Sequence, residues 1–422
     1  MVLSPSTKSL QSPLTNVETG TSAQGALAAY RKNIKGLPQA ATWGGLFSGL
    51  LVVLVSTTGP LAILFQAASA GHLSKEMISS WLLMIFLGSG LFSLILSLRH
   101  GMPIIGAWGS ATTALLVTGL PEHSFSQVIG AYFVASIVLL IVGVTKTFDS
   151  IMKLVPRPVV MAMLAGILFR FGVGVFTSLS TNLILGLSMI FAFFIGRRYG
   201  WRAPVVAALG VGLVVAGLQS KLTNPHIALT LAKPVWTTPA FEIGAIFTLA
   251  LPIFLMVLTT QNAAGIAVLR NSNYQPPVNH IVTWGAVLSI LGAGFGGSGV
   301  NVSTITAAIV TQESADPNPK TRYFAGVSCG FFYILLAFFG ATVTGLFQSI
   351  PVEMMATVAG LALIPVIASS SYDALAEPGY REAGLATLMI TISGVSAWHL
   401  GSPFWGLVGG VLIHRVTARK IA

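Results

Sequence analysis

A segment of eighteen residues occurs twice in this chain, and glycines interrupt both copies. The first copy, at 101–118, reads GMPIIGAWGSATTALLVT, and the second, at 294–311, reads GFGGSGVNVSTITAAIVT. At this offset of 193 residues the identical pairs are Gly101/Gly294, Gly106/Gly299, Ser110/Ser303, Thr113/Thr306, Ala114/Ala307, Val117/Val310 and Thr118/Thr311. A weaker match at the same offset aligns Pro158, Val159 and Met161 with Pro351, Val352 and Met354. Glycine-interrupted apolar segments at matching places in two halves indicate the binding site of a transporter.

The composition is that of a polytopic membrane protein. Hydrophobic residues make up 54% of 422, charged residues only 8%, and the mean hydropathy is +0.84. A span needs roughly 20 apolar residues. Besides the two repeated segments, the expected spans are 43–70, 77–98, 125–145, 158–178, 180–196, 203–219, 240–268, 278–293, 322–346, 351–371, 382–399 and 402–414.

The basic residues set the expected orientation, because Lys and Arg gather in short cytoplasmic loops. With the N-terminus inside, 18 of the 22 Lys and Arg residues lie inside, Lys75, Lys221 and Lys233 lie outside, and Arg170 lies within a span. The charge of +11 then reflects topology and gives no reason to expect a nucleic-acid partner. Both termini are expected to be cytoplasmic, and residues 1–42 read as a polar tail without the apolar region of a cleaved signal.

These observations predict an all-α polytopic membrane protein with 14 spans, arranged as two inverted repeats of seven. Seven is odd, so the second copy enters the membrane from the opposite side. Glycine and proline make 103–109 and 294–302 poor helix formers, so we expect spans 3 and 10 each to contain a short extended segment followed by a half-helix. Ser110, and Ser303 or Asn301, stand where the half-helices would be capped.

Two half-helices that start near the bilayer midplane would point free N–H groups and partial positive charge into one cavity, which would attract an anion. No Asp or Glu falls at a span centre, which argues against a cation site. Alternatively, the glycines only allow close helix packing. The predicted substrate-binding residues are Thr58, Gly106, Ala107, Trp108, Gly109, Ser110, Thr260, Gln261, Asn262, Gly299, Val300, Asn301, Val302, Ser303 and Thr304.

Two predictions carry explicit alternatives. Gln261 and Asn262 are adjacent amides in mid-span, suited either to a ligand with two acceptor oxygens or to hydrogen bonds between helices. Arg170, near mid-membrane, is either a counter-ion for the substrate or a structural group paired with backbone carbonyls.

Nothing in the sequence indicates catalysis or a cofactor. No Cys and His spacing is typical of zinc, so no metal is expected. Gly294 to Gly299 fits a dinucleotide motif but lies between spans rather than in a βαβ unit. An enzyme would need an activated nucleophile, an acid pair or a metal in the cavity, and none is recognisable.

Three stretches resemble the benzoate/proton symporter family of bacterial inner membranes. They are SLRHGMPIIGAWGSATTALL, LPIFLMVLTTQNAAGIAVLRNSNYQPP and GAGFGGSGVNVSTITAAIVTQESADPNP, and the likeness extends from about Trp43 over nearly the whole chain. The family is similar in architecture to uracil and xanthine permeases and to sulfate and bicarbonate transporters. After the cytoplasmic tail (1–42), the resemblance implies a core domain (43–146, spans 1–4, and 240–347, spans 8–11) and a gate domain (147–239, spans 5–7, and 348–422, spans 12–14). Related folds suggest a homodimer.

The resemblance also bears on the substrate. In nucleobase permeases, spans 8 and 10 carry carboxylates that bind the base, whereas the matching positions here read Gln261, Asn262, Val302, Ser303 and Thr304. The expected function is import of benzoate or a similar aromatic carboxylate with protons, by alternating access at the inner membrane. The alternatives are an inorganic-anion (sulfate or bicarbonate) or nucleobase transporter of the same fold and, less favoured, an anion channel. The proton carrier is open among the substrate, Glu353, Asp373 and His100.

Overall fold

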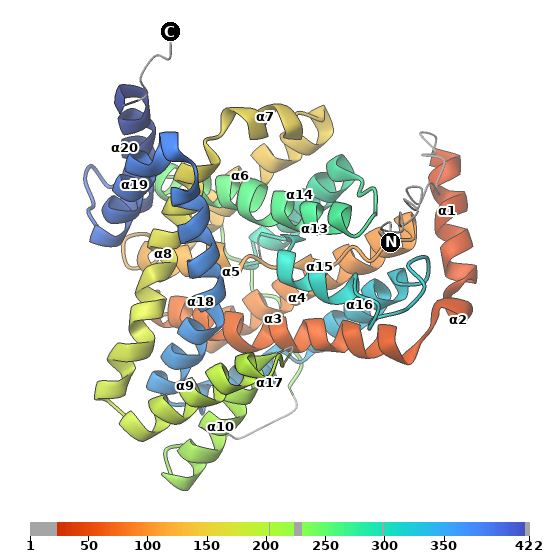
Figure 1. The fold of residues 1–422 in the computed structure, drawn as a ribbon, viewed down its shortest axis with the longest axis horizontal. Helices are drawn as coiled ribbons and strands as arrows, with labels where there is room; N and C mark the ends of the chain where they lie inside the picture. Colours follow the sequence, from red (N-terminus) through yellow and green to blue (C-terminus); the bar gives the residue numbers. More distant parts are fainter. Residues whose placement is uncertain (1–22, 202, 223–229, 298, 418–422) are drawn as a thin grey trace, which may run out of the picture.

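The computed structural model describes residues 23–201, 203–222, 230–297 and 299–417 (Figure 1). These residues fold into helices joined by short loops, with one two-stranded sheet. The expectation of a mostly helical membrane protein is confirmed.

Six helices are long and apolar enough to cross a membrane among the residues described. They are α3 (Trp43–Ala70), α4 (Lys75–His100), α6 (Phe125–Thr145), α8 (Arg157–Thr177) with η1 (Ser178–Ser180), the composite span Ile243–Asn271, and α18 (Val352–Ala376). The composite span consists of α11 (Ile243–Ala245), the π-helical η2 (Ile246–Ala250), α12 (Leu251–Leu255), the π-helical η3 (Met256–Asn262) and α13 (Ala263–Asn271). The pair α16 (Tyr323–Phe338) and α17 (Gly340–Gln348) is also long and apolar enough when taken together, but it is bent, as in a broken span or a re-entrant loop.

The remaining elements are shorter. They are α1 (Ala23–Lys35), α2 (Leu37–Ala40), β1 (Gly106–Ala107), α5 (Ser110–Gly119), α7 (Phe148–Leu154), α9 (Leu183–Arg198), α10 (Pro204–Leu218), α14 (Val278–Ala293), β2 (Asn301–Val302), α15 (Thr304–Val310), η4 (Pro378–Tyr380), α19 (Arg381–Ser393) and α20 (Ser402–Thr417).

Local chemistry sets several helix boundaries. The hydroxyl of Thr42 accepts the N–H of Gly45 at the start of α3, and Ser124 with Gln127 forms a capping box at the start of α6. Two expected spans differ from the structure. The span 322–346 bends by 70° between α16 and α17, and α19 ends before 399 because Gly394 adopts a left-handed φ of +71°.

Part of the expected polar tail is helical and docked. The amide of Asn33 in α1 donates to the carbonyl of Leu98 near the end of α4, at 2.7 Å. The hydroxyl of Tyr323 at the start of α16 donates to the carbonyl of Asn33, at 2.9 Å. Helix α1 therefore lies at the end of the bundle where α4 finishes and α16 begins (Figure 1).

The helices pack in pairs, of which some are distant in sequence and others are consecutive. The most extensive contacts join α18 with α8, α16 with α4, α14 with α6, α19 with α20, and α10 with α9. In Figure 1, α8, α18, α19 and α20 form one flank, and α3, α4, α14 and α16 form the other. Glycines permit the closest approaches: a Cβ on Gly360 of α18 would lie 2.3 Å from the carbonyl oxygen of Phe171 in α8.

Candidate functional site

The two broken spans meet through a short antiparallel sheet. Strand β1 pairs with β2, with Gly106 opposite Val302 and Ala107 opposite Asn301. Each strand leads into a helix, α5 after β1 and α15 after β2. The sequence-based expectation of an extended segment followed by a half-helix is therefore confirmed in both copies, and the two half-helices begin next to the same sheet.

Serine and asparagine side chains from neighbouring helices satisfy the extended backbone. The N–H of Gly106 donates to Ser93 Oγ at 2.8 Å, and the N–H of Val300 donates to Ser289 Oγ at 3.0 Å. The N–H of Val302 donates to Asn262 Oδ1 at 3.1 Å. Buried backbone groups need such partners because no water reaches them. The sequence analysis missed Ser93 and Ser289, since a lone serine in an apolar helix gives no signal of what it will meet.

Two glycines are required by this crossing. A Cβ on Gly106 would lie 2.7 Å from the carbonyl oxygen of Ser89, closer than the two atoms can approach. Gly299 has a φ of +74°, and a Cβ there would lie 3.2 Å from Thr112 Oγ1 and 3.6 Å from the nitrogen of Gly109. The second broken span thus passes directly against the start of α5, where any larger residue would be strained.

The starts of both half-helices lack side-chain caps. Ser303 occupies the N-cap position of α15, as expected, but its hydroxyl makes no capping hydrogen bond. The expectation for the first copy is wrong by one residue: Gly109 is the N-cap of α5, and Ser110 is its first helical residue. The first N–H groups of a helix have no partner within the helix, so both half-helices retain donors at this point.

Burial divides the predicted site residues into two layers. Gly106, Ala107, Trp108, Gly109, Thr58, Asn262, Gly299, Val300, Asn301 and Val302 are buried. Ser110, Thr260, Gln261 and Ser303 are partly exposed, and Thr304 is exposed. These five partly or fully exposed residues are called the accessible edge of the predicted site.

Two polar atoms in the buried layer have no hydrogen-bond partner among the described residues. They are Trp108 Nε1, on a residue 4% exposed, and Asn301 Oδ1, on a residue with no exposure. The amide nitrogen of Asn301 donates to the carbonyl of Gly299. A buried polar group without a partner is costly, so the indole N–H and the amide oxygen are candidates for contacts with a ligand or water.

The threonine hydroxyls are already engaged. Thr58 donates to the carbonyl of Leu54 at 2.6 Å, and Thr260 donates to the carbonyl of Met256 at 2.7 Å. A hydroxyl has one hydrogen to donate. In this arrangement Thr58 and Thr260 can accept hydrogen bonds from a ligand but not donate to it.

The adjacent amides have different surroundings. Asn262 ties the composite span to β2 through Val302, which agrees with the structural alternative for this residue. The side chain of Gln261 is partly exposed and makes no hydrogen bond within the described part of the chain. Gln261 and Asn262 are the last two residues of the π-helical segment η3. Such π-helical turns frequently occur at functional sites. No pattern in the sequence indicated this π-helix.

Arg170 is exposed in α8, and a Cβ on Gly394 would lie 3.8 Å from its Nη2 atom. Its role as a counter-ion stays a prediction. Two acids that were considered as proton carriers form ion pairs. Oδ2 of Asp373 lies 2.9 Å from Nη2 of Arg157. Oε1 of Glu353 lies 3.4 Å from Nζ of Lys221. The third candidate, His100, has its Nε2 atom 3.4 Å from Nδ1 of His280.

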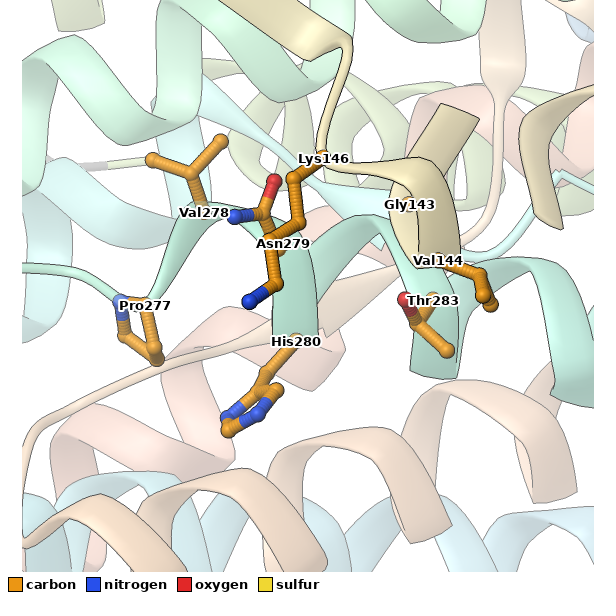
Figure 2. A pocket seen from close by; sticks show the side chains of 8 residues that line it. All are labelled: Gly143, Val144, Lys146, Pro277, Val278, Asn279, His280 and Thr283. Atoms are coloured by element: carbon orange, nitrogen blue, oxygen red, sulfur yellow. The ribbon is translucent and has the colours of Figure 1, made fainter. Parts of the chain in front are cut away.

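A pocket of about 390 Å³ lies between the end of α6 and the start of α14 (Figure 2). Lys146, Asn279, His280 and Thr283 contribute its polar lining. None of the predicted substrate-binding residues lines it. Within the described ranges, no group of His, Cys, Asp or Glu is arranged to hold a metal ion.

Solved structures of anion transporters have the same fold. The transmembrane domain of the cyanobacterial bicarbonate transporter BicA matches with a TM-score of 0.57 at 13% identity, covering 89% of this chain and 97% of that domain. SLC26A9 matches with a TM-score of 0.58 at 11% identity, over 93% of this chain and 69% of that one. The murine anion transporter Slc26a9 in its inward-facing state gives 0.56 at 10% identity, over 96% and 74%. The chain thus has the fold of a polytopic helical transporter domain.

The sequence comparisons identify the family. Residues 39–416 match the family model described as benzoate membrane transport protein. The benzoate membrane transport protein of Acinetobacter baylyi is 35% identical over 389 residues, covering 92% of this chain and 99% of that protein. The inner membrane protein YdcO of Escherichia coli is 33% identical over 365 residues, covering 86% and 93%. This chain belongs to the benzoate membrane transport protein family, which is a family of membrane transporters and not a class of enzymes.

Proposed function

We propose that this transporter imports benzoate or a similar aromatic carboxylate together with protons, and binds it where α5 and α15 begin. The observation that carries this proposal is the pairing of β1 with β2, which brings the starts of both half-helices to one place. Each start offers N–H groups without helical partners and partial positive charge, which favour an anion.

The side chains around this point suit a carboxylate. The fifteen predicted site residues include no Asp or Glu, so no fixed negative charge repels the substrate. The unpartnered indole N–H of Trp108 can donate to a carboxylate oxygen, and the amide of Gln261 lies at the accessible edge. The face of the Trp108 indole offers apolar surface for the ring.

The site requires movement for access, since ten of its fifteen residues are buried. We propose 14 spans in two inverted repeats, with a core domain (43–146 and 240–347) that moves against a gate domain (147–239 and 348–422). The contact between the copies supports this symmetry. At the 193-residue offset, Gly106 corresponds to Gly299 and Val302 corresponds to Gly109. If a two-fold axis relates the copies, the contact between Gly106 and Val302 must have a counterpart between Gly299 and Gly109. These two glycines do lie against each other.

The proposed location is the bacterial inner membrane, with both termini cytoplasmic. The distribution of Lys and Arg along the sequence supports this orientation. The docking of α1 near the end of α4 is consistent with it, because α4 is expected to finish on the inner side. The Escherichia coli relative is named as an inner membrane protein. A homodimer remains part of the proposal, by analogy with related folds.

A second candidate is transport of an inorganic anion. It is favoured by the fold likeness to a bicarbonate transporter and to an anion transporter, because N–H donors without side-chain acids would also hold bicarbonate or sulfate. Benzoate is preferred because the apolar surface beside the N–H groups would be unused by a small hydrated anion.

Uptake into proteoliposomes separates these functions. The purified protein should accumulate labelled benzoate against its gradient when a pH gradient, acid outside, is imposed. Excess unlabelled benzoate should abolish uptake, whereas sulfate, bicarbonate and uracil should not. Accumulation of sulfate or bicarbonate without competition by benzoate would establish the second candidate, and flux that neither saturates nor runs uphill would indicate a channel.

A further inference from the structure

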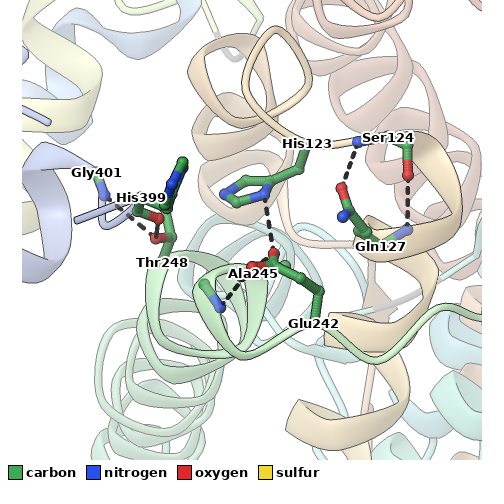
Figure 3. Close-up of polar contacts among 9 residues, drawn as sticks. His123, Ser124, Gln127, Glu242, Ala245, Thr248, His399 and Gly401 are labelled. Atoms are coloured by element: carbon green, nitrogen blue, oxygen red, sulfur yellow. Dashed lines mark hydrogen bonds and ion pairs between the residues drawn. The ribbon is translucent and has the colours of Figure 1, made fainter. Parts of the chain in front are cut away.

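A cluster of titratable groups lies at the far end of α5 from the proposed substrate site (Figure 3). His123 follows α5 by four residues, and its Nδ1 atom lies 3.5 Å from Oε2 of Glu242. The His123 side chain is 5% exposed and that of Glu242 is 40% exposed. Water therefore reaches the carboxylate directly, while the imidazole is enclosed.

Both oxygens of Glu242 also hold the start of the composite span. Oε1 accepts the N–H of Gly244 at 3.0 Å, and Oε2 accepts the N–H of Ala245 at 2.9 Å. The ring of His123 thus packs against a carboxylate whose position is fixed by backbone donors. The other ring nitrogen, Nε2, is buried and has no hydrogen-bond partner among the described residues.

The loop between α19 and α20 closes this cluster. The hydroxyl of Thr248 donates to the carbonyl of His399 at 3.3 Å and accepts the N–H of Gly401 at 3.2 Å. A Cβ on Gly244 would lie 3.1 Å from the carbonyl oxygen of His399, so the loop rests on the first turn of the composite span. Figure 3 shows the His123 ring between the Glu242 carboxylate and the side on which this loop lies.

The net charge of the cluster around His123 depends on whether a proton is bound. The titratable groups on the segments packed around His123 are Glu242, Glu122 and His399; Glu122 and His399 are exposed, and a Cβ on Gly401 would lie 3.7 Å from Glu122 Oε2. The segments 119–125, 242–248 and 397–402 contain no Lys or Arg. Within these three segments only a protonated imidazole can supply positive charge, and imidazole is the side chain that ordinarily titrates near neutral pH. Arg170 of α8 lies beside Gly394, where a Cβ would be 3.8 Å from its Nη2 atom.

We propose that His123 and Glu242 form the proton-binding site of this transporter. This inference rests on the proposed proton-coupled function and names a site that differs from Glu353, Asp373 and His100. A proton from the solution binds Nε2 of His123 when the 394–401 loop is displaced, and the imidazolium is held by the Glu242 carboxylate. Return of the loop encloses the proton, and its release on the other side restores the neutral ring.

The position of the cluster links it to the substrate site. Helix α5 runs from Gly109, beside the crossing strands, to Gly119, whose carbonyl accepts the N–H of His123 at 2.9 Å. Ten helical residues span about 15 Å. The composite span likewise begins at Glu242 and reaches Gln261 and Asn262. Two rigid elements therefore connect the proton site with the substrate site.

The test compares two transport modes in proteoliposomes, using His123→Gln and Glu242→Gln. Benzoate counterflow, which needs no net proton movement, should persist in both variants, whereas accumulation driven by a pH gradient should fall by about tenfold or more. Glu313→Gln, a change at an exposed carboxylate, is the matched control and should behave as wild type. Wild-type protein without gradient-driven accumulation would contradict the proposed function. Wild-type coupling that both variants retain in full would overturn the present inference.

A second measurement tests the inference without a transport assay, in protein that keeps both His123 and Glu242. Spin labels are attached at Lys75→Cys and Trp398→Cys, both exposed positions, after Cys329→Ser removes the buried native thiol. The distance between labels should shift between about pH 5.5 and about pH 8 as the loop responds to protonation, and His123→Gln should remove the shift. A distance that does not depend on pH while His123 is present would also overturn the inference.

Discussion

Helix α5 is buried along most of its length, from Ala111 to Leu116, whereas in the shorter α15 both Thr304 and Ile305 are exposed. The strand before α5 is held by a serine of α4, and the strand before α15 by a serine of α14 and by Asn262 of the composite span. The two copies thus have different tasks. The first provides an enclosed wall that carries Trp108, and the second provides the accessible edge with Ser303 and Thr304.

The largest effect on benzoate uptake is expected from a larger side chain at Gly106, in the first copy. In Gly106→Val the added carbons would meet the carbonyl oxygen of Ser89 and the ring of Phe92, costing about 1–3 kcal/mol or more by overpacking. We expect loss of benzoate uptake and a lower melting temperature. Gly210→Val is the control, because a Cβ there meets nothing within 4 Å. Normal uptake by Gly106→Val would mean that the strands do not cross as described.

The next largest effect is expected for the side chains that accept hydrogen bonds from the N–H groups of the two strands. Asn262→Ala and Ser93→Ala each leave a buried N–H without its acceptor, of Val302 and of Gly106 respectively, at a cost of about 1–3 kcal/mol. Both variants should melt at a lower temperature. Asn262→Ala should also weaken benzoate binding more than Ser93→Ala, because it loosens the accessible copy. Equal binding by both variants would remove the distinction between the copies.

Trp108→Phe keeps a six-membered aromatic ring and removes the N–H donor together with the rest of the five-membered ring of the indole. If this donor binds the carboxylate, the Kd for benzoate should rise by about tenfold, equivalent to about 1.4 kcal/mol. Calorimetry on the detergent-purified protein measures the change. Trp398→Phe, at a residue 82% exposed, should leave the Kd unchanged. An unaltered Kd in Trp108→Phe would show that the ring acts only as an apolar wall.

A smaller effect is expected for the remaining amides. Gln261→Ala and Asn301→Ala combined should raise the Kd for benzoate by a few fold, because Gln261 is partly exposed and the amide nitrogen of Asn301 already donates to the carbonyl of Gly299. Competition by unlabelled benzoate in the uptake assay gives the value. Unchanged binding in the double variant would exclude these two side chains from the substrate site.

The smallest effect is expected at Arg170. A Cβ on Gly394 would lie 3.8 Å from its Nη2 atom, which places the guanidinium beside the end of α19 and not at the starts of α5 and α15, so Arg170→Gln should change the Kd by no more than about threefold. Normal transport with unchanged affinity would end the counter-ion hypothesis. A loss of about a hundredfold would instead place this guanidinium at the substrate.

The sequence predicted the parts of the fold that depend on local composition. The spans 125–145 and 278–293 agree with α6 and α14 to the residue, and the glycine-rich segments correctly marked the two extended strands. The bend at Phe339, the two π-helical segments and the docking of α1 escaped prediction. They depend on packing between distant segments, for which apolar periodicity carries no information.

The candidate site shows the same limit. The repeat identified the segments that meet, because duplication records a shared structure. It did not identify Ser93 or Ser289 as partners of the strands, nor did it show that Thr58 and Thr260 donate to their own helices. No role was predicted for His123 and Glu242. They are 119 positions apart in the sequence, and only the fold brings their side chains to within 3.5 Å of each other.

The central claim is that the substrate lies between the starts of α5 and α15. An experimental structure of the protein with benzoate bound tests it most directly. The account predicts the carboxylate within about 3 Å of N–H groups at Ser110 or Ala111 and at Thr304 or Ile305, with the ring beside Trp108. Benzoate bound in the pocket between α6 and α14, with both half-helix starts unoccupied, would contradict the account.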